Sequence, residues 1–439
     1  MPTRHSIAPR RKAGTAFVSS VLHNRALWRA TKSGISQAVR IGVVGREHRV
    51  YAPRCSRPSD HEDLPVRLSE IAVVVAATAA WVPSSSKAQD ALRSRLTLPP
   101  GFTIAEYAKV GGVRFMAIAP DGAVYASRPE AGEVVRLVDA DHNGEAESQT
   151  VAVSGLNRPH GLAFHAGYLF IANTDGVVRV RLGTNGTASG PPERVNSYSA
   201  GGGHWSRSIV FGPDSAMYVT IGSTCNMCVE KTPDRAAVMR YDANGGNGRV
   251  FSSGLRNAVG IAVNPVTKQI WATQNERDNI EPEHEDLPPE EINILQDGGD
   301  YGWPYCYGNR IPSPDRDFHD PARCARTIPP ALEMQAHSAP LGITFLDRAT
   351  MFPADWRGDA VVAFHGSWNR SVPTGAKVVR IRIRDGKPVS YEDFITGWQG
   401  PNGRRWGRPV DLVVYTDGSL LISDDAAGAI YRVTRTEAR

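Results

Sequence analysis

The stretch Met116-Ala-Ile-Ala-Pro-Asp-Gly-Ala-Val-Tyr-Ala-Ser127 decides the fold, because its pattern returns along the chain. It combines a short apolar strand, a turn and a second apolar strand, and Glu133–Leu137 behind it predicts a third strand. Five more copies of the strand pair follow, at residues 161–172, 209–220, 260–273, 341–364 and 411–423. Each is followed by a third strand, at residues 177–180, 238–241, 292–295, 377–381 and 429–433.

The copies recur about every 60 residues, which is near the spacing of propeller blades. One such sheet cannot bury its faces alone, whereas radial stacking buries them and leaves only short edges. The sequence therefore predicts an all-β, six-bladed β-propeller domain within residues 89–439. The alternative is a β-sandwich or two β domains, which a repeat that runs through the whole segment disfavours.

The positive charge of the chain lies at its N-terminal end. The 439 residues have a net charge of +5, but residues 1–65 hold 12 Lys and Arg against 4 Asp and Glu. Residues 89–439 hold 36 Lys and Arg against 40 Asp and Glu. A nucleic-acid-binding domain needs clustered positive charge on its folded part, so nucleic acid is not an expected partner.

A segment typical of a signal peptide lies inside the chain. Arg67 precedes the apolar run Ile71–Val82, and Ser86-Lys-Ala88 has the small residues of a cleavage site. The run is too short to span a membrane. Because signal peptides begin chains, we expect translation to start at Val66 and residues 1–65 to be non-native or disordered. The segment 66–88 would be removed, and the protein would be periplasmic or secreted; an internal core element is the alternative.

Cysteine usage agrees with export. Of the five cysteines, Cys55 falls in the segment expected to be absent, which leaves an even number. Two disulfides, Cys225–Cys228 and Cys306–Cys324, are favoured in an oxidising compartment. A four-cysteine zinc site is the alternative, which the spacing of the second pair disfavours.

Residues at one offset in the copies should meet at the central channel, because the loops that lead into the inner strands converge there. The position eight or nine residues ahead of each first turn holds Asn157, with His160 close by, then His204, Arg256, His337 and Arg408. Cations and imidazoles around one cavity suit an anionic ligand and proton transfer. His204, preceded by three glycines, is the candidate general base.

Two acidic segments have the oxygen ligands that calcium prefers. Residues 274–278 and 284–293 hold several carboxylates in a proline-rich loop. The segment Asp139-Ala-Asp-His-Asn-Gly144 begins like an EF-hand loop, but its twelfth position is Thr150 and not glutamate. A solvated acidic loop is the alternative in both places.

Residues from about 96 to 434 resemble the soluble pyrroloquinoline quinone (PQQ) dependent glucose and sorbosone dehydrogenases, and more closely the sorbosone branch. The resemblance rests on short motifs that occur in the family's order. They are His204–Asp214, Gly254–Gly260, Asp286–Asn293, Asp300–Pro304, Ala336–Gly342 and His365–Arg370. The family fold is a six-bladed propeller, in agreement with the repeat.

The resemblance implies PQQ and Ca²⁺ as cofactors and gives roles to residues of this chain. His204 matches the catalytic base, Arg256 and Asn257 match a pair that contacts PQQ, and Arg256 would also reach the substrate. Arg408 would bind a quinone carboxylate, and Asn369, Arg370 or Lys377 would supply the cation of the fifth blade. The carbonyls of Glu276 and Arg277 would hold the calcium that clamps PQQ. Glu291 and the carbonyl of Tyr301 would hold a structural calcium.

Three positions depart from the glucose dehydrogenase pattern. Val410 replaces the second arginine of an Arg-x-Arg pair, and His337 replaces a tryptophan beside the cofactor. Leu156 aligns with a glutamine, so Asn157 or His160 would serve instead. These changes follow the sorbosone-like branch and disfavour glucose as the substrate.

The resemblance implies oxidation of an aldose or sugar aldehyde, with hydride transfer from C1 to C5 of PQQ and His204 as general base. An electron acceptor, a cytochrome or a quinone, would then reoxidise the cofactor, and the enzyme would be a monomer or homodimer. Two alternatives stay open: an exported binding propeller that has lost PQQ, and a calcium-dependent hydrolase of the lactonase type.

Overall fold

The computed structural model describes residues 85–281 and 285–435. The predicted extension 1–65 and the signal-like segment 66–88, except for its last four residues, lie outside the described residues. Those four residues begin helix α1 (Ser85–Arg95). In the described part of the chain, no helix is both long and apolar enough to cross a membrane.

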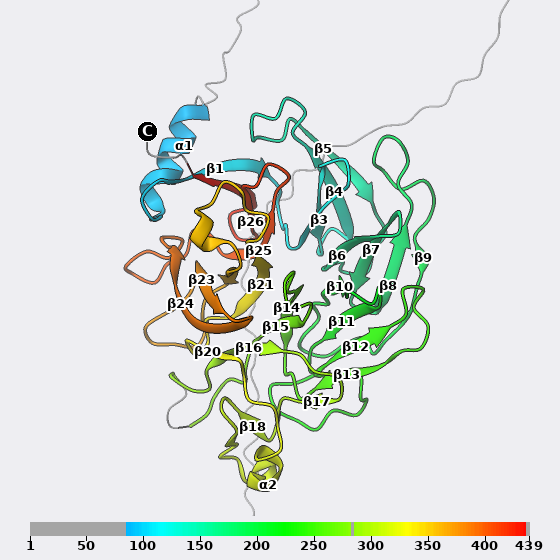
Figure 1. Ribbon diagram of the computed structural model, residues 1–439, viewed down its shortest axis with the longest axis vertical. Helices are drawn as coiled ribbons and strands as arrows, with labels where there is room; N and C mark the ends of the chain where they lie inside the picture. The colour runs from blue at the N-terminus through cyan, green and yellow to red at the C-terminus, as the bar shows by residue number, and fades with distance from the viewer. Residues whose placement is uncertain (1–84, 282–284, 436–439) are drawn as a thin grey trace, which may run out of the picture. The chain divides into compact units, whose positions relative to one another are not determined.

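Six small antiparallel sheets surround a central axis, which confirms the predicted six-bladed β-propeller (Figure 1). The first blade contains β2 (Met116–Ile118), β3 (Val124–Arg128), β4 (Glu133–Val138) and β5 (Ser148–Val153). The second contains β6 (Leu162–His165), β7 (Tyr168–Asn173), β8 (Gly176–Val180) and β9 (Glu193–Arg194). The third contains β10 (Ile209–Phe211), β11 (Met217–Ile221), β12 (Ala237–Tyr241) and β13 (Arg249–Ser253), to which β17 (Gly299–Asp300) adds a parallel edge.

The other three blades follow the same order from the axis outward. The fourth contains β14 (Ala258–Val263), β15 (Ile270–Gln274), β16 (Glu290–Ile294) and β20 (Leu332–Met334). The fifth contains β21 (Pro340–Phe345), β22 (Ala360–Phe364), β23 (Lys377–Arg384) and β24 (Lys387–Ile395). The sixth contains β25 (Pro409–Val414), β26 (Leu420–Asp424), β27 (Ala429–Arg435) and β1 (Phe102–Lys109). A small hairpin, β18 (Cys306–Tyr307) with β19 (Ile311–Pro312), and the short helix α2 (Pro321–Cys324) lie between β17 and β20.

The hydrophobic core lies between neighbouring blades. The second strands β11, β15, β22 and β26 are buried at every position, because each is covered on both faces by an adjacent blade. Trp271 of β15, for example, packs with Val362 and Phe364 of β22. Burial on both faces explains why these strands are mostly apolar and do not alternate, with buried polar residues at Thr220, Thr273, Gln274, Ser423 and Asp424.

The ring is closed by the first strand of the domain. Strand β1 pairs antiparallel with β27, from Phe102 opposite Arg435 to Lys109 opposite Ala429. The outermost strand of the sixth blade therefore comes from the N-terminal end of the propeller. The sequence repeat did not predict this strand, because it precedes the first copy.

An apolar plug of four residues lies where the inner strands begin. Phe115, Val259, Leu341 and Val410 come from four different blades, are all buried, and pack into one cluster. Val410 is the residue that replaces a family arginine, and its side chain is part of this plug.

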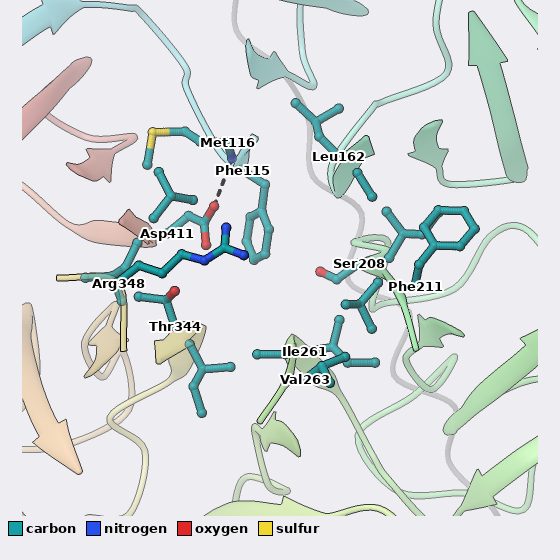
Figure 2. A pocket seen from close by; sticks show the side chains of 17 residues that line it. Phe115, Met116, Leu162, Ser208, Phe211, Ile261, Val263, Thr344, Arg348 and Asp411 are labelled. Atoms are coloured by element: carbon teal, nitrogen blue, oxygen red, sulfur yellow. Dashed lines mark hydrogen bonds between the residues drawn. The ribbon is translucent and has the colours of Figure 1, made fainter. Parts of the chain in front are cut away.

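A cavity of about 550 Å³ lies between the inner strands. It is lined by residues that follow the plug residues along these strands. Figure 2 shows its walls, which are mainly aliphatic, with Arg348 and Asp411 as charged groups. Asp411 is buried and accepts a hydrogen bond of 2.8 Å from the backbone N–H of Met116, so it links the sixth blade to the first. The candidate catalytic histidine does not line this cavity.

Asp411 should make the stability of the ring depend on pH. Burial raises the pKa of its carboxyl to about 7. The folded chain then holds a proton that the unfolded chain releases at lower pH, so the contribution to stability is present in acid and is lost as the pH rises through 7. We expect the free energy of unfolding to fall by roughly 2 kcal/mol more between pH 5 and 8 in the wild type than in Asp411→Asn. Equal pH dependence in urea titrations of the two proteins would contradict this assignment.

Strand β1 should be required for stability. Ile104 lies in β1 and is buried in the interface of the sixth blade. Replacing it with alanine should lower the free energy of unfolding by about 2–5 kcal/mol, because a large cavity remains. Lys109→Ala, at an exposed position of the same strand, is the control and should change it by less than about 0.5 kcal/mol. Denaturant unfolding of the full chain measures both.

Candidate active site

Two sets of loops form one mouth of the central channel, on the other side of the plug from the cavity. In an antiparallel sheet the start of the inner strand lies beside the end of the second strand, so residues before the one and after the other share this mouth. The residues before inner strands are Arg114, His160, His204, Arg256, His337 and Arg408. The residues after second strands are Ser223, Asn275, Glu276, His365 and Asp425.

His204 is oriented by the residue that follows β11. Its Nδ1 lies 3.0 Å from the carbonyl oxygen of Ser223 and 2.9 Å from the hydroxyl of the same residue. A carbonyl only accepts, so Nδ1 carries the proton and Nε2 keeps its lone pair. Burial, followed by the positive charge of Arg256, lowers the pKa of His204 to about 3. The imidazole is therefore neutral at physiological pH and can accept a proton at Nε2.

Gly222 allows His204 and Asn257 to approach each other. A Cβ atom at this position would lie 2.6 Å from Oδ1 of Asn257 and 2.7 Å from Cβ of His204. Only glycine leaves space for both side chains at these distances.

Arg256 is buried and held by the loops around it. Its guanidinium donates to the backbone and side-chain oxygens of Asn226, at 3.1 and 2.9 Å, and to the carbonyl of Glu276 at 2.6 Å. It also lies 3.4 Å from the carboxylate of Asp278. Burial lowers its pKa, but the group remains a cation, since arginine is protonated at any physiological pH.

Asp278 joins the fourth blade to the fifth. Its carboxylate accepts a hydrogen bond of 3.0 Å from Asn369 and lies 3.6 Å from Nδ1 of His337. Its backbone N–H donates to Asn226 at 2.9 Å. These contacts place His337 and Asn369 around the carboxylate that also faces Arg256.

The other side of the mouth has a second charged network. Asp425 accepts from Arg114 at 2.6 Å and from Nε2 of His365 at 2.9 Å. Although burial opposes its ionisation, the hydrogen bond from His365 and the charge of Arg114 lower the pKa of Asp425 to about 2. Arg408 donates to the carbonyls of His365 and Gly366, at 2.8 and 3.0 Å, which joins the sixth blade to the fifth.

Several buried polar atoms at the mouth have no partner in the described part of the chain. They are Nε2 of His160, Oδ1 of Asn257, Oδ1 of Asn369, and Nε and Nη2 of Arg207. The His160 ring also contacts Phe115 in a tilted arrangement and Trp205 edge to face, with ring centroids 4.2 and 5.5 Å away. Unsatisfied buried donors and acceptors are costly in a folded protein, so a polar ligand at this mouth would recover part of that cost.

Three glutamates of the fourth blade, Glu276, Glu290 and Glu291, are buried near the mouth. Glu290 accepts from the backbone N–H groups of Glu276 and Ala339, at 2.7 and 3.0 Å. Glu291 accepts from Gly308 and Asn293, at 3.0 and 2.9 Å. Burial raises the pKa of Glu276 and Glu291, and that of Glu290 to about 8. Glu290 and Glu291 are consecutive in β16 and so face opposite sides of the sheet, and among the described residues the three carboxylates do not form one cluster of oxygen atoms.

Some residues predicted for the site have their polar contacts elsewhere. Lys377 pairs with Asp393 of the outer strand β24 at 2.6 Å, and Arg370 pairs with the exposed Asp286 at 3.2 Å. Arg277 directs its guanidinium to Asp315, and Tyr301 donates its hydroxyl to the carbonyl of Ile294. The backbone carbonyl of Asn157 accepts from Thr174, and its side chain is exposed.

Several residues of the mouth were missed by the sequence reasoning. They are Arg114, Asn226, Asp278, His365 and Asp425. Arg114 could have been found by counting back from the start of the inner strand, where it takes the same place as His160 and Arg256. His365 and Asp425 follow second strands, a position that was not compared among the copies.

Both predicted disulfides are present. Cys225–Cys228 closes a short loop whose second residue is Asn226, the partner of Arg256 and Asp278. Cys306–Cys324 joins the small hairpin to α2. The first disulfide is therefore part of the support of the mouth.

The fold and the mouth together define a six-bladed propeller whose central site is rich in cations, imidazoles and amides. The chain belongs to the TrAA12-like family, whose profile matches residues 97–436. This match confirms the kind of family expected from the motifs, while the sorbosone branch stays a prediction.

Two of the similar proteins are named for their dependence on one cofactor. A pyrroloquinoline quinone-dependent sugar dehydrogenase of Hypocrea jecorina is 25% identical over 367 residues, which are 69% of this chain and 81% of that protein. A pyrroloquinoline quinone-dependent pyranose dehydrogenase of Coprinopsis cinerea is 28% identical over 240 residues, 43% of this chain and 31% of that protein. An uncharacterized protein of Borreliella burgdorferi is 32% identical over 225 residues; the match spans half of this chain and 57% of that protein.

Solved structures share the fold. A Trichoderma reesei protein of Carbohydrate-Active Enzymes Family AA12 superimposes with a TM-score of 0.70 at 22% identity, covering 78% of this chain and 98% of that one. The PQQ domain of the Coprinopsis cinerea pyranose dehydrogenase, in its holo form, gives a TM-score of 0.67 at 22% identity, covering 77% and 97%.

The support of Arg256 can be tested through Asn226. Asn226→Ala removes the side-chain oxygen that accepts from Arg256 and from the backbone of Asp278. Arg256 then keeps only the longer contact of 3.4 Å with Asp278 for this donor, so the free energy of unfolding should fall by about 1–3 kcal/mol in denaturant titrations. Asn244→Ala, in an exposed turn, is the control. An Asn226→Ala protein as stable as the control would show that Asn226 does not hold Arg256.

Proposed function

We propose that this protein is a PQQ-dependent dehydrogenase that oxidises the C1 position of an aldose or sugar aldehyde, sorbosone-like, at the mouth of the propeller. The proposal rests on the orientation and protonation state of His204. This histidine is neutral, it is oriented through Nδ1, and its free Nε2 stands among cations and amides. The names of the relatives from Hypocrea and Coprinopsis support the cofactor and the substrate class.

The residues of the mouth fit a polyanionic quinone. PQQ has three carboxylates, and when bound it supplies a two-electron acceptor. Arg408 and Arg256 supply positive charge, and Asn257, His160 and Asn369 offer buried polar atoms that lack partners. Arg370 and Lys377 belong to the same proposal, although their contacts are with Asp286 and Asp393. Asn157, on the exposed rim, and His337, beside Asp278, complete the predicted set.

Calcium is the proposed second cofactor. The clamp on PQQ would use the carbonyls of Glu276 and Arg277, and the first of these accepts from Arg256 in this structure. Glu291 and the carbonyl of Tyr301 would hold the structural ion. The buried carboxylate of Glu291 supports the structural ion, since burial disfavours its charge and a divalent cation would favour it.

The chain's own part in the reaction is proton transfer and orientation. Oxidation at C1 of an aldose, or of an aldehyde hydrated by water, removes a hydride from carbon and a proton from the hydroxyl oxygen, and His204 would take that proton at Nε2. The carbonyl of Ser223 fixes the orientation of the imidazole ring of His204 and takes no part in the proton transfer. Arg256, buried beside His204, disfavours the imidazolium before the reaction and so keeps the base free.

The first experiment is a titration of the full chain with PQQ, with and without Ca²⁺, followed by absorbance and by dye reduction with aldoses and aldehydes. Calcium-dependent binding with turnover is expected. Binding of neither cofactor would favour the binding propeller, and hydrolysis of lactones without quinone would favour the hydrolase.

The role of His204 is tested by His204→Ala. We expect kcat to fall about 10²- to 10⁴-fold, the usual contribution of a general base, with PQQ binding retained. His319→Ala, an exposed histidine outside the mouth, should leave kcat unchanged. Because the pKa of His204 is about 3, its protonation should cause no loss of rate between pH 8 and 5. Full turnover in His204→Ala would refute the assignment.

A further inference from the structure

A calcium ion in the loop between β4 and β5 is our further inference: we propose that residues 139–147 bind one Ca²⁺ through carboxylates and backbone oxygen. The loop belongs to the first blade, none of its residues takes part in the mouth, and the inference does not depend on the proposed dehydrogenase activity.

Three carboxylates of this loop converge. One oxygen each of Asp139, Asp141 and Glu147 lies within 4.8 Å of the others. Counted from Asp139, they occupy positions one, three and nine of a calcium-binding loop, with Asn143 at five and the carbonyl of Glu145 at seven. The sequence offers threonine at position twelve, and the structure shows that the glutamate at nine brings its own carboxylate to the cluster.

Asp139 has an unused acceptor inside the loop. Its side chain is buried, with 5% of the residue exposed, and Oδ2 accepts from the backbone N–H of Gly144 at 3.0 Å. Oδ1 is buried and has no hydrogen-bond partner among the described residues. The two oxygens of a carboxylate are adjacent, so this free acceptor lies at the cluster. A buried carboxylate oxygen without a donor is unfavourable unless a cation or a donor completes it.

The charge of the cluster is not balanced by the described part of the protein. None of the three carboxylates forms an ion pair with a lysine, arginine or histidine there. Arg432 lies near Gly144 and is engaged by Asp417. Three negative groups this close repel one another, and a divalent cation between them would remove the repulsion.

The ligand chemistry selects calcium. All candidate ligands are oxygen atoms, which exclude the soft and nitrogen-preferring metals. A loop of carboxylates, an amide and a carbonyl, two of whose acids are exposed, adapts to the variable geometry of Ca²⁺ better than to the strict octahedron of Mg²⁺. Without a bidentate glutamate at position twelve, we expect affinity in the range of extracellular modules, with a Kd of about 10⁻⁴ to 10⁻³ M.

The loop is attached to the strand that closes the ring. The backbone N–H of Ala146 donates to the carbonyl of Tyr107 in β1 at 2.8 Å, and Glu147 donates its N–H to Val138 of β4 at 3.0 Å. A bound ion would therefore hold the end of β4, the start of β5 and the closing strand β1 in one arrangement.

The test counts calcium bound by the full chain. Chelator-treated protein is dialysed against 45Ca²⁺ at several times the expected Kd, and the bound ion per chain is compared among variants. Asp141→Asn with Glu147→Gln, at two exposed positions, should bind one ion fewer than the wild type. Glu145→Gln, which keeps the backbone carbonyl, is the matched control and should bind as many as the wild type. An unchanged count in the double variant would overturn the proposal.

Hydrogen exchange locates the ion without any measurement of activity. Adding Ca²⁺ should slow amide exchange in residues 139–150 of the wild type at least several-fold, and should leave the double variant unchanged. Slowing to the same degree in both proteins, or equal slowing by Mg²⁺ at the same concentration, would overturn the assignment. A protein that shows this response but no PQQ-dependent turnover would refute the proposed function alone.

Discussion

Closure of the ring by β1 is the constraint on which the rest of the structure depends. Every blade contributes to the mouth only because the six inner strands surround one axis, and the pairing of β1 with β27 fixes the last blade against the first. Asp411, which accepts from Met116 across the same junction, adds a contact on the inner side. A strand from the beginning of the domain thus positions His204, Arg256 and Arg408, none of which it touches.

Once the ring is closed, contacts within the protein hold the groups of the mouth in place. Arg256 is fixed by Asn226 and Asp278, and Arg408 by carbonyls of the fifth blade. Such preorganisation lets charged and polar groups act in a poorly solvated site without reorganising at the moment of reaction. Its cost is visible in the atoms that remain without partners and in the glutamates whose ionisation burial opposes.

Sequence reasoning found the blades because their second strands are buried on both faces and are therefore mostly apolar. It missed the outermost strands, since β9 is wholly exposed and β5 is exposed over its first four residues, and such strands lack an apolar pattern. The shared offset found His204, Arg256 and Arg408. It missed Asp278 and Asp425, because a carboxylate that holds an arginine in place is indistinguishable in sequence from one on a solvated loop. The spacing of the calcium-loop motif did not identify Glu147 as a ligand. Its carboxylate reaches Asp139 and Asp141 because the chain turns there into β5.

The plug of Phe115, Val259, Leu341 and Val410 lies between the mouth and the cavity of the inner strands. Because these four side chains are buried and packed together, a molecule that reacts at the mouth should leave on the side from which it entered. Substrate and electron acceptor would then enter through the same opening, one after the other. An enzyme built in this way should show ping-pong kinetics, with parallel double-reciprocal plots, as a direct outcome of four packed apolar side chains.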